Sequence, residues 1–217
     1  YLDQVTIQTS AALVYFCQAF DFLAASGALE TNEYAAIKSR ILTLGMGFFD
    51  AYFVRMSYTL PLFQNNHSIK AATGIGMVAL LFPEAPESAV LIQQALSAID
   101  YYHLNHQVCP GGANAEGPAY FEYTMINLRG FGVALHRIAN GQPMPIVRQC
   151  RALPKECVAG PATIPDVLFS TAHRQVVEDW LPNLWLPLGY VANIDDADLV
   201  SYNWAFDAFL YKSPTAR

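Results

Sequence analysis

Apolar residues return at the spacing of an α-helix in five successive stretches of this 217-residue chain. Each stretch is longer than a typical strand and is bounded by glycine, proline or a polar capping residue. No strand ladder is evident between them. We therefore expect an all-α fold built from antiparallel helical hairpins. The predicted helices run from about Asp3 to Ser26, from Thr31 to just before Pro61, from about Asn66 to Phe82, from about Glu87 to His106 and from about Pro118 to Ala139.

The composition indicates how these helices are arranged. The sequence is 53% apolar and only 14% charged, which is rich in apolar residues for a globular domain. Several helices must therefore be buried on more than one side. A ring of hairpins, with residues 67–82 and 118–139 as inner helices, meets that requirement within a single domain over residues 1–217. No apolar run is long enough to predict a membrane-spanning helix.

The charge pattern argues against nucleic acid as a partner. The net charge is −6, and the sequence has no basic stripe of the kind that nucleic-acid-binding proteins present. An acidic polymer would be repelled by the chain as a whole. Any polyanion must therefore be bound by a local cluster of suitable side chains.

The last third of the sequence is less regular. Five prolines lie between residues 140 and 166, so this part is predicted to be mostly loop, with one short helix near Ile146 to Arg151. Helical periodicity returns at residues 172–181 and again at 196–211. Residues 184–194, between those two helices, are predicted to be extended.

The cysteines form no close pair of the kind that binds a metal. Cys150 and Cys157 bracket a short loop that a disulfide could close in an exported protein, and the sequence leaves their state open. The spacing of His103, His106 and Cys109 could be read as a metal site. The positive character preferred at a helix C-terminus explains the two histidines equally well, and no carboxylate completes the set. We expect neither a metal nor another cofactor.

Two polar segments at the starts of predicted helices are the strongest candidates for function. The first is Gln64-Asn65-Asn66-His67, and the second spans residues 112–123. Together they offer amide, imidazole and phenol groups, which can hold a carboxylate and move protons. Functional residues often lie at such loop-to-helix positions on a rigid scaffold.

The same two segments resemble a known family. The pair Asn66-His67 begins a helix and is followed by small residues, and about one hairpin later a glycine-rich loop leads to Glu116-Gly117 and the aromatic run at 120–123. Over about residues 60–140, this pattern resembles the α/α-toroid part of the heparinase II/III-like and alginate-lyase-like polysaccharide lyases. One difference is that the family loop often has Asp-Gly where this chain has Pro110-Gly111.

The resemblance implies a small or incomplete α/α toroid that cleaves a uronate-containing polysaccharide by β-elimination. In that reaction the proton alpha to the uronate carboxylate is removed and the 4-linked oxygen leaves. Relatives carry a C-terminal β-sandwich domain that supplies a further catalytic histidine. The resemblance therefore implies that this chain is a fragment whose site is completed elsewhere. Degradation of such a polymer suggests a periplasmic or secreted protein.

The resemblance assigns catalytic roles to three residues. Asn66 would donate from its amide to the uronate carboxylate and so stabilise the developing enolate. His67 would donate as well, or act as a base. Tyr123 would protonate the leaving oxygen or, when ionised, remove the proton. The residues alone also allow simpler roles, since Asn66 could be an ordinary N-cap and Tyr123 a core aromatic with a bonded hydroxyl.

Four further residues are candidates for substrate binding. Tyr120 lies three residues before Tyr123 and shares its helix face. Glu116 would orient the loop or bind a sugar hydroxyl, although an acidic residue is also favoured at a helix N-terminus. Arg129 and Lys70 would supply the positive charge that an ionised phenol needs.

Two other functions fit the same sequence. One is a glycoside hydrolase on a similar toroid, in which Glu116 or Glu122 works with another acid such as Asp50. The other is a non-catalytic toroid that binds carbohydrate or belongs to an assembly.

Overall fold

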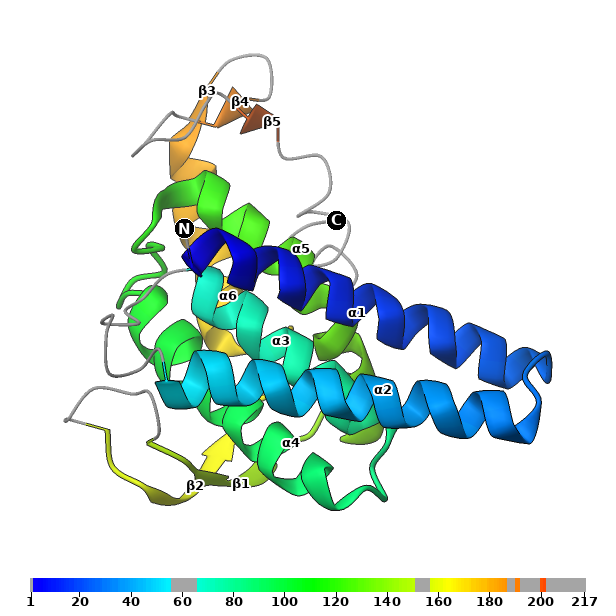
Figure 1. The fold of residues 1–217 in the computed structure, drawn as a ribbon. Helices are drawn as coiled ribbons and strands as arrows, with labels where there is room; N and C mark the ends of the chain where they lie inside the picture. The colour runs from blue at the N-terminus through cyan, green and yellow to red at the C-terminus, as the bar shows by residue number, and fades with distance from the viewer. Residues whose placement is uncertain (1, 56–65, 151–156, 187–189, 192–199, 202–217) are drawn as a thin grey trace. The chain divides into compact units, whose positions relative to one another are not determined.

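The computed structural model describes residues 2–55, 66–150, 157–186, 190–191 and 200–201. Within them the chain is mainly helical, as the periodicity predicts, and two small β-sheets accompany the helices (Figure 1). Backbone contacts divide the chain into two compact units, each assembled from separate stretches of sequence. Unit 1 comprises Tyr1–Leu62, Lys70–Ala98 and Ile146–Ala162, and unit 2 comprises Phe63–Ile69, Ile99–Pro145 and Thr163–Arg217.

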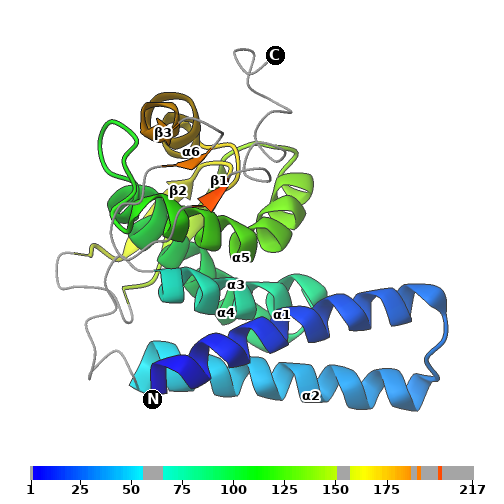
Figure 2. The same ribbon diagram turned by 90° about the horizontal axis from the view of Figure 1, so that it is seen from above.

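An antiparallel hairpin of two long helices begins unit 1. The helices α1 (Leu2–Ser26) and α2 (Thr31–Phe49) lie side by side in Figure 1 and in Figure 2, and a short turn at Gly27 joins them. Glu30 and Glu33 form a capping box, in which a carboxylate oxygen of Glu33 accepts the Glu30 backbone N–H at 3.0 Å. Because a capping box satisfies N–H groups that the helix itself leaves unpaired, α2 starts at the predicted residue.

The remaining helices of unit 1 are η1 (Asp50–Arg55), a π-helical continuation of α2; α3 (Asn66–Leu81), whose first turn belongs to unit 2; and α4 (Pro86–Ala98). Glycines allow these helices to pack closely. A Cβ on Gly45 would lie 3.0 Å from a methyl of Val78, and one on Gly74 would lie 3.2 Å from Cβ of Ser10. Gly45 and Gly74 therefore mark close approaches rather than helix ends, whereas a Cβ on Gly47 would have no described atom within 4 Å.

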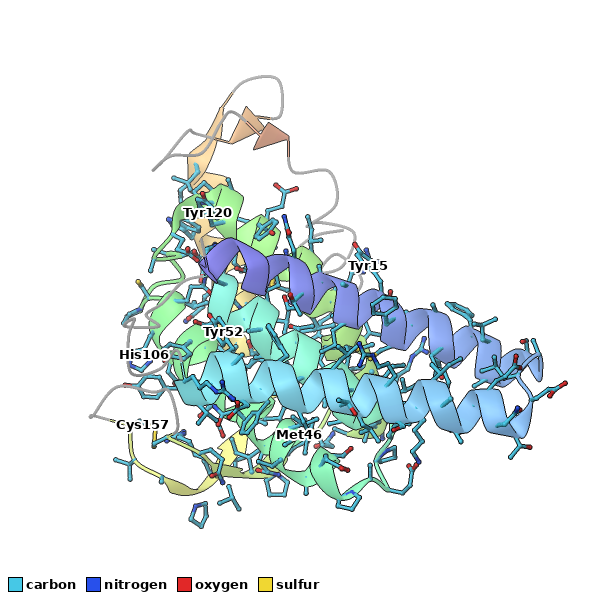
Figure 3. All side chains as sticks on the ribbon, viewed as in Figure 1. Tyr15, Met46, Tyr52, His106, Tyr120 and Cys157 are labelled. Atoms are coloured by element: carbon cyan, nitrogen blue, oxygen red, sulfur yellow. A yellow bond between two sulfur atoms is a disulfide. The ribbon has the colours of Figure 1, made fainter. Side chains whose placement is uncertain are left out.

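Aromatic rings fill much of the core of unit 1. Phe20 packs against Tyr34 and Phe82, with ring centroids 5.0 and 5.4 Å apart. Cys17 is buried nearby on α1, and burial raises the pKa of its thiol to about 12, so it remains an uncharged apolar group. In contrast, Tyr15 on the same helix is 69% exposed (Figure 3).

The helices of unit 2 are η3 (Ile99–Gln107), α5 (Gly117–Ile138), α6 (Thr171–Gln175), η4 (Val176–Trp180) and η5 (Leu181–Leu184). They confirm the helices predicted near residues 99–106, 118–139 and 172–181. Pro118 lies in the first turn of α5, where its missing N–H leaves no helical bond unmade. A Cβ on Gly132 would lie 2.5 Å from Cγ of Leu168, so α5 and the segment before α6 approach closely.

Two small sheets complete the described part of the chain. The first consists of β1 (Met144–Arg148) and β2 (Gly160–Ile164), and the boundary between the units runs through both strands. The second consists of β3 (Trp185–Leu186), β4 (Tyr190–Val191) and β5 (Val200–Ser201), with antiparallel pairs in that order. The extended structure predicted for residues 184–194 is confirmed at residues 185–186 and 190–191, whereas Leu184 is the last residue of the 3-10 helix η5.

Strand β1 corrects the prediction of a short helix near Ile146 to Arg151. The residue before a proline avoids the helical region, and Pro145 itself has no N–H to donate. The extended backbone instead bonds to side chains of α4. The N–H of Val147 donates to Oε1 of Gln93 and that of Gln149 donates to Oγ of Ser97, each at 2.8 Å. Tertiary partners in α4 therefore decide the conformation of this segment.

Most of the helix predicted at residues 196–211 lies outside the described residues. The two residues of that range that are described, Val200 and Ser201, form β5 rather than a helix. Their pairing partner is β4. At these two positions the helical prediction is wrong, because backbone pairing with a neighbouring strand replaces the local helical hydrogen bonds.

A disulfide joins Cys150 and Cys157, the pair whose state the sequence left open. Their Cα atoms lie 5.7 Å apart, within the range that such a bond requires. Residues 151–156, between the two cysteines, lie outside the described residues. Cys17 and Cys109 take no part in a disulfide.

Candidate functional site

Asn66 and Glu116 bring the two segments identified in the sequence into contact within unit 2. Asn66 starts α3 and is 3% exposed. Its Nδ2 donates to Oε1 of Glu116 at 3.1 Å. Its Oδ1 is buried and has no hydrogen-bond partner among the residues that the structure describes. A buried acceptor without a partner is uncommon in proteins, and a ligand is one group that can satisfy it.

The loop before α5 is held by its own backbone and by Asn114. The N–H of Cys109 donates to the carbonyl of Ala113 at 2.7 Å, and that of Ala115 donates to the carbonyl of Gln107 at 2.8 Å. Oδ1 of Asn114 accepts the Glu116 N–H at 3.0 Å. The glycine-rich loop is therefore an ordered support for the start of α5.

Gly112 explains why this loop contains glycine. Its φ is +88°, and a Cβ there would lie 2.5 Å from the backbone oxygen of Gln175. Both the conformation and the lack of space exclude a larger residue. The loop thus packs directly against the backbone where α6 passes into η4, which fixes Glu116 relative to the segment that carries His173.

Glu116 directs its carboxylate away from its own helix. Although it is the residue before α5, its side chain makes no capping bond. Oε1 accepts from Asn66, and Oε2 lies 2.6 Å from Nε2 of Gln107. Burial raises the pKa of the Glu116 carboxyl, against the opposing effects of the bonds to Asn66 and Gln107 and of the charge on His67.

Two histidines that the sequence did not identify as a pair are connected to this carboxylate through Gln107. His103 and His173 are completely buried, and their Nε2 atoms lie 2.5 Å apart. Nδ1 of His103 contacts Oε1 of Gln107. His173 is positioned by Ser170, whose Oγ accepts the His173 N–H at 3.2 Å as the N-cap of α6. The spacing of His103 and Gln107, four residues apart, was a readable signal, but nothing local pointed to His173.

His67, Tyr120 and Tyr123 are half-buried residues of unit 2. His67 follows Asn66 in α3, and its charge acts on Glu116. Tyr120 lies in the first turn of α5 (Figure 3), and Tyr123 lies one turn further along the same face. Oδ1 of Asn66, the carboxyl of Glu116 and these three side chains provide the polar groups available at the two helix starts.

The two predicted cationic residues are placed differently. Arg129 is exposed on α5, six residues beyond Tyr123, which is about 9 Å along the helix axis and roughly a third of a turn around it. Lys70 is 7% exposed on α3 and belongs to unit 1. Neither is joined to Glu116 or Asn66 by the contacts described above.

The residues considered as a metal site do not gather around a common point. His106 directs Nδ1 to the carbonyl oxygen of Tyr101, and its ring stacks on that of Tyr101 with centroids 4.1 Å apart. Among the described residues, no three histidine, cysteine or acidic side chains are grouped as metal ligands. The two buried histidines bond to each other instead.

No protein-family model matches this chain, and no curated protein and no solved structure matches it either. None of the helices in the described part of the chain has the length and apolar character needed to cross a bilayer. The functional assignment therefore depends on the residues of the site and on the resemblance noted above.

Proposed function

We propose that this chain is the helical toroid part of a polysaccharide lyase that cleaves a uronate-containing polymer by β-elimination. The observation that carries the proposal is the hydrogen bond from Asn66 to Glu116. It joins, across 50 residues of sequence, the two segments on which the resemblance to the heparinase II/III-like and alginate-lyase-like families depends. The segment that begins with Asn66-His67 and the segment that begins with Glu116-Gly117 are thus in contact within unit 2.

The first chemical requirement of the reaction is stabilisation of the uronate carboxylate. The alpha proton is weakly acidic while that carboxylate is charged, so donors must be placed where negative charge develops. Asn66 has an amide held in place by Glu116, and His67 follows it in the same helical turn. In the proposed site both donate to the carboxylate. The unpartnered Oδ1 of Asn66 accepts a sugar hydroxyl.

The second requirement is proton transfer. Tyr123 is the proposed acid and base: its ionised oxygen removes the alpha proton, and its hydroxyl returns a proton to the departing 4-linked oxygen. Atoms balance, because the substrate loses one C–H and one C–O bond and gains a carbon–carbon double bond. Tyr120 and Arg129, which also belong to unit 2, are proposed to bind neighbouring parts of the polymer.

The Cys150–Cys157 disulfide supports the proposed location outside the cytoplasm. Disulfides persist in oxidising compartments such as the periplasm and the extracellular space. A polymer too large to enter a cell must also be cleaved there. We further propose that a β-sandwich domain outside this chain completes the site with a histidine.

Glycoside hydrolysis is the second candidate, and one observation favours it. Burial raises the pKa of both Glu116 and Glu122, which is the property that a general acid needs. Asp50, the second acid considered in the sequence, belongs to unit 1 and is ion-paired with Arg55 at 2.5 Å.

The nature of the products distinguishes the two functions. The protein expressed from its complete gene is incubated with a panel of uronans that differ in epimer and sulfation. A lyase generates unsaturated uronate ends, which absorb in the ultraviolet, and new reducing ends appear in equal number. New reducing ends without that absorbance would identify a hydrolase. If no uronan yields either product, the lyase proposal is wrong for this protein.

A further inference from the structure

A continuous series of polar contacts runs through the interior of unit 2. Nδ1 of His173 lies 3.2 Å from the carbonyl oxygen of Leu168, and its Nε2 lies 2.5 Å from Nε2 of His103. Nδ1 of His103 contacts one side-chain amide atom of Gln107, and the other lies 2.6 Å from Oε2 of Glu116. We call His173, His103, Gln107 and Glu116 the polar relay.

The carbonyl of Leu168 determines the tautomers of the two imidazoles. A carbonyl oxygen only accepts, so His173 must carry a hydrogen on Nδ1. A neutral His173 then presents a lone pair at Nε2, and the facing Nε2 of His103 must donate to it. A neutral His103 is left with a lone pair on Nδ1, which requires a donor from Gln107.

Gln107 can donate to His103 if its amide turns its nitrogen toward that ring. A half-turn of the terminal amide exchanges its nitrogen and oxygen. The oxygen of Gln107 then faces Oε2 of Glu116 at 2.6 Å, so Glu116 must carry a hydrogen there. This separation is also closer to the usual O–H···O length than to that of N–H···O. Oγ1 of Thr124, 3.4 Å from the same amide atom, can donate to it as well.

We propose that the polar relay keeps Glu116 as a neutral carboxylic acid at neutral pH, with Gln107 accepting its proton and both imidazoles uncharged. Each titratable group then carries one hydrogen, on Nδ1 of His173, Nε2 of His103 and Oε2 of Glu116. In this arrangement every contact of the relay joins one donor to one acceptor. His103 and Gln107 act as positioning residues for Glu116.

Burial decides which group of the relay holds the proton. Moving it from Glu116 to His103 would place an imidazolium in the interior, separated from the new carboxylate by Gln107, and unpaired buried charges are costly. Burial lowers the pKa of His103 from its ordinary 6.5 to about 4, against the opposing bond to Gln107. Burial also lowers the pKa of His173 and raises that of Glu116.

Three elements of unit 2 carry further titratable groups. On α3, the charge of His67 lowers the pKa of Glu116, but burial outweighs it. On η3, the buried Asp100 accepts a hydrogen bond from Nδ2 of Asn105 at 3.1 Å. On α5, Glu122 is half-buried, and burial raises the pKa of its carboxyl. Neither of these two acidic residues supplies a positive charge that would hold Glu116 ionised.

The consequence of a neutral Glu116 for substrate binding rests on the proposed function. A carboxylate directly behind Asn66 would repel the carboxylate of a bound uronate. A neutral Glu116 still accepts from Nδ2 of Asn66 through Oε1, at 3.1 Å. It therefore orients the amide without adding negative charge to a site for an anion.

Nuclear magnetic resonance of the unliganded protein locates the protons without any assay of lyase activity. At pH 7 we expect the carboxyl carbon of Glu116 to resonate as a protonated acid. The ring nitrogens should show neutral His103 with hydrogen on Nε2 and neutral His173 with hydrogen on Nδ1. An ionised Glu116 would overturn the proposal. His103 would then be either doubly protonated or neutral with its hydrogen on Nδ1. In the neutral case, Nδ1 of His173 and the carbonyl oxygen of Leu168 would face each other as two acceptors.

Glu116→Gln tests the same point by substitution, with Glu122→Gln, on the helix that Glu116 precedes, as the matched control. Glutamine is the uncharged isostere of a protonated glutamate, since its NH₂ can donate to Gln107 while its oxygen accepts from Asn66. We expect E116Q to melt no lower than the wild type at pH 7. If Glu116 is ionised instead, the new NH₂ meets a donor, and a Tm more than about 4 °C below that of E122Q would refute the proposal.

The pH dependence of the Tm of the wild type and of E116Q is a third test. A carboxyl whose pKa is raised by folding stabilises the protein most below its ordinary pKa, and this contribution is lost as the pH rises through the raised pKa. The Tm of the wild type should therefore fall relative to that of E116Q as the pH increases. A difference in Tm that stays constant with pH would contradict the proposal. None of these three measurements uses substrate, so all of them remain decisive if the lyase proposal fails.

Discussion

Glu30 and Glu116 each stand immediately before a helix, but their carboxylates are used differently. Glu30, before α2 in unit 1, is exposed and forms a capping box with a residue three positions along. Glu116, before α5 in unit 2, makes no capping bond and instead contacts Asn66 and Gln107, which are 50 and 9 residues away. The same residue type at the same helical position thus makes a local contact in unit 1 and long-range contacts in unit 2.

The loop before α5 makes this difference possible. Oδ1 of Asn114 accepts the Glu116 N–H, and the carbonyl of Asn114 accepts the Gly117 N–H, both at 3.0 Å. Pro118 has no N–H that requires an acceptor. Because these residues reduce the need for a cap, the carboxyl of Glu116 is free to bond elsewhere. A glutamate at a helix start is thus a candidate for function when its neighbours already satisfy the backbone.

The largest expected effect comes from comparing a tyrosine of α5 with a tyrosine of α2. In the protein from its complete gene, Tyr123→Phe should reduce elimination on the order of 10²- to 10⁴-fold, since it removes a positioned acid and base but keeps the ring. Tyr34→Phe in α2 is the control and should leave turnover unchanged. Initial rates of unsaturated uronate formation measure both variants. Near-normal turnover by Y123F would make Tyr123 a packing residue and refute the proposed mechanism.

The second-largest expected effect is the difference in stability lost when a glycine before α5 and a glycine before α2 are each replaced by alanine. Gly112→Ala should destabilise the protein by about 2–5 kcal/mol, because a left-handed φ adds strain and the new Cβ meets the backbone of Gln175. Gly27→Ala, before α2, should cost only about 1 kcal/mol from strain, since no described atom lies within 4 Å of its Cβ position. Urea unfolding of the two variants compares them. Equal losses of stability would mean that the loop before α5 adjusts to an added Cβ as easily as the turn before α2 does.

Removing each glutamate side chain should have a smaller effect. Glu116→Ala leaves the buried amides of Asn66 and Gln107 without their hydrogen-bond partner, and should cost about 1–3 kcal/mol. Glu30→Ala removes one part of an exposed capping box and should cost less. Urea unfolding at pH 7 measures both. A greater loss for Glu30→Ala would indicate that the contacts of Glu116 add nothing to stability.

The smallest expected effect is a local response to acid. The pKa of His103 is lowered to about 4 by burial, so its stabilising contribution is complete above its ordinary pKa of 6.5 and is lost as the pH falls toward 4. Amide hydrogen exchange should therefore quicken in η3 and α6 over that range, after correction for the intrinsic pH dependence of exchange. The start of α2, which contains no histidine, serves as the reference. A uniform change in both regions would show that acid acts elsewhere.

Local sequence signals determined most of the helices and placed the candidate residues at helix starts. The capping pattern at residues 31–33, Asn66 at the start of α3 and Pro118 in the first turn of α5 are signals that span about one turn, so they could be read without a tertiary structure. The same signals placed Asn66 and Glu116 beside backbone that helices leave unpaired. They did not predict that the two side chains bond to each other.

Only the tertiary structure decided which polar groups meet in the interior. His103 and His173 are 70 residues apart, and no periodicity or capping rule relates them. The same holds for β1, where Pro145 weakened a helix but the side chains of Gln93 and Ser97 supplied the bonds of an extended segment. Helix formation depends on neighbours within four residues, whereas a buried polar group must find its partner among whatever the fold brings beside it.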